Sequence, residues 1–149
     1  MQIFADENDC KNGGVSPQRP EDISLLSFTY KQFIKKGENL FDLRDRLINH
    51  CFIEKKTSFR VFKRFFSGKE VLSPLRWTGN DSEFFYFVYL IYTKHKLVKD
   101  LKRHQWEVAC RCFVKADGTQ FDPTKLKKLK KTQKTAGIIE KAVELLNNG

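Results

Sequence analysis

The sequence predicts an all-α fold, a helical bundle, and two observations support this. Apolar residues recur at intervals of three and four along most of the 149 residues, and stretches that alternate between apolar and polar residues are almost absent. Hydrophobic residues make up 40% of the chain, and 14 of its residues are Phe, so it can bury a core and is not globally disordered. The length suits one domain, or two small helical parts that share a core.

The N-terminal stretch, residues 1–20, is predicted to be a weakly ordered lead-in. It contains Gly13-Gly14, Pro17 and Pro20 and has little apolar content. Through residue 22 it holds five acids and two bases, a net charge of −3 that is opposite in sign to the whole chain. A solvated tail is the favoured interpretation, and a segment that folds back over a basic body is the alternative.

Residues 21–70 are predicted to form an N-terminal helical part that begins with two helices. The first covers 21–36, where apolar residues recur at helical spacing, and Gly37 suits its C-terminal end. The second covers roughly 39–53 and carries a leucine stripe that a core would bury.

A third, short helix is predicted at about 58–67, with Thr57 as its N-cap and Gly68 at its end. One half of its helical wheel is made of Phe and Val side chains, which must be buried. The other half must face solvent or an anion, and it carries three cations: Arg60, Lys63 and Arg64.

Residues 73–149 are predicted to form a C-terminal part, which begins with a short extended piece at 75–78. A helix over 81–94 follows, because Asn80 with Glu83 three residues later matches a capping box. This helix is apolar nearly all round, which places it at the centre of the core.

The remaining pattern predicts a helix over 102–114, a sixth helix opened by Asp122-Pro123, and a closing helix over 135–147. Asp117-Gly118 marks a turn between the first two. Residues 110–121 also fit a β-hairpin, and a hairpin next to helices is what a winged helix requires. The two alternatives stay open at this point.

Positive charge is concentrated in two stretches of the chain. There are 28 Lys and Arg against 18 Asp and Glu, for a formal net charge of +10. Residues 94–134 hold thirteen bases and four acids, and residues 55–69 hold six bases and no acid. Such clustering is typical of proteins that bind polyanions. The prediction depends on these cations converging into one stripe on the folded molecule.

The sixth helix is the most lysine-rich segment, and Leu126 and Leu129 are its only aliphatic anchors. It is therefore expected to dock shallowly and to present its outer face to a major groove or to phosphates. Six lysines are the predicted phosphate contacts: Lys125, Lys127, Lys128, Lys130, Lys131 and Lys134. A second contact to the nucleic-acid backbone is predicted at Arg60, Lys63 and Arg64. Because lysine binds phosphate as a point charge, the pattern favours backbone binding over sequence reading. The alternative is a solvated lysine-rich face that keeps the protein soluble.

No catalytic, metal or cofactor site is predicted. Cys110 and Cys112 lie near His104 and His95, but two positions on a helix that are two residues apart diverge by about 200°, so both thiols cannot easily face one zinc ion. The histidines have no recognisable nucleophile partner, and Ser67-Gly68-Lys69 lacks the upstream glycine of a phosphate-binding loop. Core packing is the favoured role of the tryptophans and phenylalanines, ahead of stacking on bases.

The composition also predicts a compartment. Four cysteines in 149 residues are too few for a disulfide scaffold, and the start of the chain lacks the order of a secretion signal. The longest apolar run, residues 84–92, is too short for a membrane span, which needs about 20 residues. A cytoplasmic protein without a membrane partner is predicted, and a homodimer is left open.

Two motifs in the C-terminal part resemble those of a known family. The first is a run followed by an apolar helix: Leu75-Arg76-Trp77-Thr78-Gly79-Asn80-Asp81-Ser82-Glu83-Phe84. The second is a basic run before the closing helix: Lys130-Lys131-Thr132-Gln133-Lys134-Thr135. Over roughly 74–146 the chain is similar to the C-terminal region of the RteC family, regulators of the excision of tetracycline-resistance conjugative elements. The resemblance implies a DNA-binding helix-turn-helix or winged-helix-like part.

The predicted function is therefore non-catalytic nucleic-acid binding, with double-stranded DNA as partner, by a transcriptional or excision regulator of a mobile element. The alternative is a protein-interaction or accessory module without nucleic-acid binding. That alternative predicts an exposed apolar patch, for which the Phe-rich third helix is the expected source. An enzyme would need a cleft with convergent polar groups, and the sequence gives no sign of one.

Overall fold

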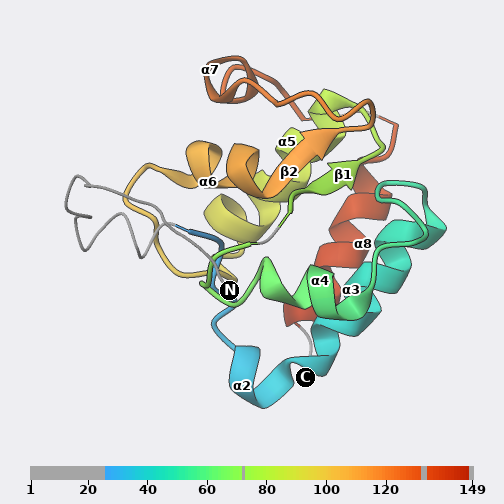
Figure 1. Cartoon of the computed structure of the whole chain (residues 1–149), viewed down its shortest axis with the longest axis vertical. Coiled ribbons are helices and arrows are strands. Elements are labelled where there is room, and N and C mark those ends of the chain that lie inside the picture. Colours follow the sequence, from blue (N-terminus) through green and yellow to red (C-terminus); the bar gives the residue numbers. More distant parts are fainter. Residues whose placement is uncertain (1–25, 72, 132–133, 148–149) are drawn as a thin grey trace, which may run out of the picture.

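The structure is a computed structural model that describes residues 26–71, 73–131 and 134–147. About half of the described residues are helical, and two short strands form a parallel sheet (Figure 1). The helices are α2 (Phe33–Lys36), α3 (Glu38–Asn49), α4 (Phe59–Arg64), α5 (Asp81–Val88), α6 (Gln105–Cys112), α7 (Pro123–Leu126) and α8 (Ala136–Asn147). A π-helical segment, η1 (Tyr89–Lys94), continues α5, and the strands are β1 (Leu75–Trp77) and β2 (Phe113–Lys115). The prediction of a mainly helical protein is confirmed.

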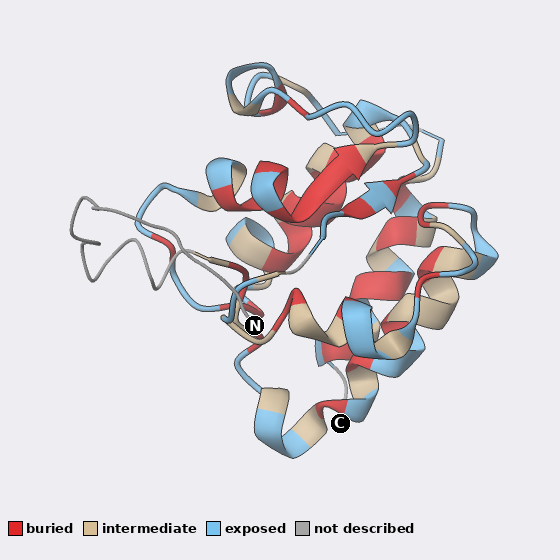
Figure 2. Cartoon of the chain, in the orientation of Figure 1, coloured by how far each residue is buried: buried red, intermediate tan, exposed pale blue. Residues whose placement is uncertain are grey.

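The core is built around α8, which packs against both α3 and α5 (Figure 1). Its inward face is Ile139, Ala142, Val143 and Leu146, all at most 2% exposed. Buried side chains from before residue 70 and after residue 73 belong to one cluster, so the two predicted parts share a core (Figure 2).

The two strands pair in parallel, with Leu75 opposite Phe113 and Trp77 opposite Lys115. Leu75 and Trp77 are buried and Arg76 between them is exposed, which is the alternation of a strand with one covered face. The extended piece predicted at 75–78 is thereby confirmed. The partner strand, β2, takes up the last two residues of the helix predicted over 102–114, so that prediction is wrong at 113–114.

The prediction of a helix over 21–36 is wrong for residues 26–32, and residues 21–25 lie outside the described ranges. Thr29 and Tyr30 form isolated β-bridges with Ser67 and Val98, and helical geometry begins at Phe33. The backbone of this segment bonds to distant loops; for example, the Tyr30 amide donates to the Phe66 carbonyl at 2.8 Å. Long-range backbone pairing has overridden the local apolar spacing.

The second and third predicted helices are confirmed with shorter bounds. The helix predicted to 53 ends at Asn49, and Cys51 then takes a left-handed conformation with φ of 63°. Ser58, and not Thr57, caps α4: its hydroxyl accepts from the Val61 amide at 3.1 Å. Thr57 is buried, and its carbonyl accepts from a neighbouring arginine instead.

The capping box predicted at the start of α5 is confirmed. The Asn80 amide donates to Glu83 Oε1 at 2.7 Å, and the Glu83 amide donates to Asn80 Oδ1 at 2.8 Å. The helix predicted over 102–114 begins later, at Gln105, because Lys102 and Arg103 have φ values of 52° and 77°, outside the helical region. The closing helix is present as α8.

The sequence predicts either a helix end followed by a turn or a β-hairpin at residues 110–121, and the structure combines parts of both. The turn at Asp117-Gly118 is confirmed, with the Lys115 amide donating to the Thr119 carbonyl at 2.8 Å. One antiparallel bridge, Val114 to Gln120, extends it, whereas the ladder of β2 is formed with β1. The helical core is thus accompanied by a small parallel sheet and not by a long hairpin in the described residues.

Candidate nucleic-acid interface

The lysine segment, defined as Lys125, Lys127, Lys128, Lys130, Lys131 and Lys134, starts within α7 at Lys125 and continues towards the start of α8. The sixth helix, predicted to carry Leu129 and these lysines, is wrong past Leu126, where α7 ends after four residues. At about 1.5 Å per residue, such a helix is about 6 Å long and cannot act as a groove-filling recognition helix. All six lysines are nevertheless exposed.

The start of α7 forms as its sequence predicts. Asp122 Oδ1 accepts from the Thr124 amide at 2.9 Å, and Pro123 occupies the first turn. The helix stops because Leu126 is its one deeply buried side chain, while Leu129 is half-buried. Past that point lysines stand three and four residues apart, and like charges at that spacing each destabilise a helix by about 0.2–0.5 kcal/mol.

One member of the lysine segment is held by the protein itself. Lys131 Nζ lies 3.5 Å from Glu140 Oε2 and 5.4 Å from the centre of the Tyr86 ring. The Tyr86 hydroxyl donates to the same carboxylate, and this bond, with the Lys131 cation, lowers the pKa of Glu140. Glu140 therefore stays charged and neutralises Lys131, which leaves less of its charge for a ligand.

The other lysines of the segment are without such a partner. Within the ranges 26–71, 73–131 and 134–147, no carboxylate pairs with their ammonium groups; these are Lys125, Lys127, Lys128, Lys130 and Lys134. Uncompensated cations on an exposed connection can approach phosphates without first giving up a protein contact.

The second predicted contact lies elsewhere. Figure 1 places α7 at the upper end of the long axis and α4 in the lower half, so the two basic groups are separated along that axis. The expected convergence of these cations into one stripe is therefore not seen for the two groups, and a nucleic-acid contact rests on the lysine segment alone. On α4, Arg60 is exposed, Lys63 Nζ lies 5.2 Å from the centre of the Phe33 ring, and the Arg64 Nε group donates to the Glu70 carbonyl. Contact of these three residues with the backbone of a nucleic acid stays a prediction.

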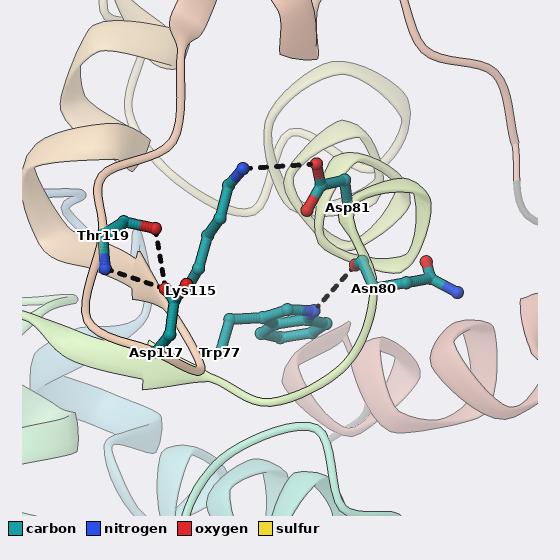
Figure 3. Close-up of polar contacts among 6 residues, drawn as sticks. All are labelled: Trp77, Asn80, Asp81, Lys115, Asp117 and Thr119. Carbon is teal, nitrogen blue, oxygen red and sulfur yellow. Dashed lines mark hydrogen bonds and ion pairs between the residues drawn. The ribbon is translucent and has the colours of Figure 1, made fainter.

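The Trp-Thr-Gly element that carries the family resemblance is part of the core. Trp77 is fully buried, and its Nε1 group donates to the Asn80 carbonyl at 3.1 Å (Figure 3). Gly79 must be small, because a Cβ there would lie 2.9 Å from Trp77 Nε1 and 2.6 Å from Glu83 Oε1. The prediction of core packing is confirmed for Trp77, which cannot stack on a base.

The surface beside this element is tied together by polar contacts. Lys115 Nζ lies 3.8 Å from Asp81 Oδ2, and Asp117 Oδ1 accepts from the Thr119 amide at 3.0 Å and from its hydroxyl at 2.7 Å (Figure 3). The Asp117 bonds close the turn after β2 on itself, and the ion pair between the exposed Lys115 and Asp81 side chains links this turn to the start of α5. Lys115 is consequently a positioning cation of the fold rather than an addition to the lysine segment.

Metal chemistry receives no support from the described part of the chain. No three His, Cys, Asp or Glu side chains come together there as metal ligands would. In the same residues, no helix is both long and apolar enough to cross a membrane. Cys110 and Cys112 are buried, in keeping with a packing role.

Iodoacetamide at about pH 8 is expected to alkylate Cys51 and to spare Cys110 and Cys112. Cys51 is exposed, whereas burial raises the pKa of both other thiols to about 12, so their reactive thiolates are nearly absent at that pH. Peptide mapping by mass spectrometry after brief labelling checks this, with protein in urea as the control in which all three react. Equal labelling of Cys51 and Cys112 in the folded protein would contradict the packing.

Sequence reasoning missed one feature, a pocket between α2 and α4 that is lined by Phe33, Val61 and Arg60 among others. Its signal was hidden, because Phe33 looked like part of a long helix and because only the fold brings it beside α4. The lysine segment, by contrast, was visible in the sequence, although its shape was not. No family model matches the chain, and no curated protein or solved structure matches it either.

Proposed function

We propose that this protein binds nucleic acid, with double-stranded DNA as the principal ligand, through phosphate contacts from the lysine segment. It acts without catalysis, in the cytoplasm, as a transcriptional or excision regulator of a mobile element. One observation carries the proposal: five lysines, Lys125, Lys127, Lys128, Lys130 and Lys134, are exposed on one short connection and have no carboxylate partner among the described residues. The resemblance of the C-terminal part to RteC regulators supports the biological role.

The contact is to the backbone and not to base edges. A helix-turn-helix reader would place α6 in the groove, but its exposed positions include an acid, Glu107, beside the cation Arg111, and Glu107 also accepts from His104. Lysines at the ends of flexible stems neutralise phosphates and release counterions, which gives sequence-independent affinity with a steep salt dependence. Sequence preference would then come from the shape of the duplex.

Changing Lys127, Lys128 and Lys130 together to alanine is expected to weaken duplex binding and to flatten its salt dependence. Each lost phosphate contact removes about 0.9 from the slope of log affinity against log salt, so the slope should fall by up to about 2.7. Fluorescence anisotropy of a labelled duplex at several salt concentrations measures this.

The matched control removes the same charge elsewhere, at Lys35, Lys55 and Lys56, which are exposed and lie outside the segment. This control should retain most of the slope. If the two triple variants lose the same amount, net charge alone explains binding. If the first keeps the full slope, the lysine segment is not the site.

A further inference from the structure

The pocket between α2, α4 and the segment after α4 has the chemistry of a binding site of its own. It has a volume of about 310 Å³, and apolar side chains of Phe33, Val61, Phe65 and Val71 contribute to its walls. Val61 is 41% exposed, and Ile34 on the adjacent helix is 90% exposed. Figure 2 shows α2 without a buried residue, as an outlying turn beside α4. The apolar walls are therefore open to a partner.

All charged side chains that line this pocket are cations: Arg60, Lys63, Arg64 and Lys69. Two of them are held in place. Lys63 Nζ lies over the rings of Phe33 and Phe59, at 5.2 and 5.7 Å from their centres. Arg64 uses Nε to bond the Glu70 carbonyl, and its terminal nitrogens have no partner among the described residues. A guanidinium fixed in this way is suited to a carboxylate.

We propose that this pocket binds an acidic peptide segment of a partner protein, with one large apolar side chain in the pocket and carboxylates on its basic rim. The charge of the rim and the apolar walls are both explained by such a ligand. The inference is independent of the proposed nucleic-acid contact, which uses the lysine segment.

A nucleobase fits the pocket less well than an apolar side chain does. Base edges present both donors and acceptors, so reading them takes acceptors, such as the oxygens of Asn, Gln and carboxylates, as well as donors. The lining has none of these residue types, and its cations can only donate. Its two hydroxyls are on Ser67 and Ser73, and that of Ser67 already donates to the Arg64 carbonyl at 2.6 Å.

The test uses the full chain and a fluorescein-labelled peptide with one central phenylalanine flanked by glutamates. Two companion peptides carry alanine in place of the phenylalanine, or glutamines in place of the glutamates. We expect saturable binding of the first peptide, at least tenfold tighter than either companion. Arg60→Glu and Val61→Asp should each weaken it at least tenfold, and circular dichroism verifies that both variants fold. The alanine variant of Lys127, Lys128 and Lys130 should bind the peptide normally.

Several results would overturn the proposal. They are the absence of binding, equal binding of the alanine companion, or no effect of either pocket variant. Tighter binding of a single-stranded oligonucleotide that Val61→Asp abolishes would make the ligand a nucleic acid. Peptide binding that appears only after Asp6, Glu7 and Asp9 are changed to their amides would identify the acidic lead-in of this chain as the occupant.

Discussion

Replacing Trp77 with alanine is expected to lower the free energy of unfolding by about 3–5 kcal/mol, the range for truncating a buried tryptophan. The indole is fully buried and lies between aromatic rings, with ring centres 5.4 Å from Phe52, 5.3 Å from Phe84 and 5.5 Å from Phe87. Neighbouring rings cannot collapse into the resulting space without leaving their own contacts. The substitution also removes the hydrogen bond that Trp77 Nε1 donates to the Asn80 carbonyl.

Urea denaturation followed by circular dichroism measures this loss. Trp106→Ala is the matched control, since Trp106 is half-buried and stacks on one ring, that of Phe85, at 5.2 Å. It should cost less than half as much. Equal losses for the two variants would show that the aromatic cluster does not centre on Trp77.

Replacing Glu83 with alanine is expected to lower the free energy of unfolding by about 3 kcal/mol or more, because hydrogen bonds to a charged acceptor contribute about 1.5–3 kcal/mol each and two are lost. Its carboxylate joins two elements: Oε1 accepts from the Asn80 amide at 2.7 Å, and Oε2 accepts from the Thr135 hydroxyl at 2.6 Å. Glu83 is 9% exposed, so water cannot easily replace these contacts. Loss of the carboxylate removes the cap at the start of α5 and the hydrogen bond that connects α5 to the residue before α8.

A double-mutant cycle with Thr135→Val separates the two contributions. The double variant should lose less stability than the sum of the losses of the two single variants. Glu83→Gln, which keeps an acceptor, should lose less stability than Glu83→Ala. An exposed acid on another helix, Glu107, provides the control, and its alanine variant should change stability little. Strict additivity of the Glu83 and Thr135 changes would rule out the connection.

Sequence reasoning succeeded where the determining contacts are local. The capping box at Asn80 and Glu83 involves residues three apart, and the turn at Asp117-Gly118 and the cap at Asp122 are equally local. Burial of Trp77 followed from its place in an apolar pattern. The capping box, the turn and the cap need no knowledge of how distant segments meet, whereas the rings around Trp77 include those of Phe52 and Phe113 from distant parts of the chain.

It failed where distant segments decide the conformation. Leu26, Tyr30 and Phe33 have helical spacing. The amides of Phe28 and Tyr30 nevertheless bond to the carbonyls of Phe65 and Phe66, more than 30 residues away. The lysine segment shows a related limit, because its first turn has good local signals but its continuation buries only part of one aliphatic side chain, that of Leu129. The pocket could not be inferred from the sequence, because it forms only where the fold places Phe33 of α2 beside α4.

The contact between the two ends of the described chain has a consequence for synthesis. The Tyr30 hydroxyl donates to the Leu146 carbonyl at 2.6 Å, and α8 supplies one wall of the core for both α3 and α5. A nascent chain on the ribosome therefore lacks that wall until residues 136–147 emerge from the exit tunnel. Its phenylalanines remain accessible to chaperones during that interval, and the emergence of α8 completes the core.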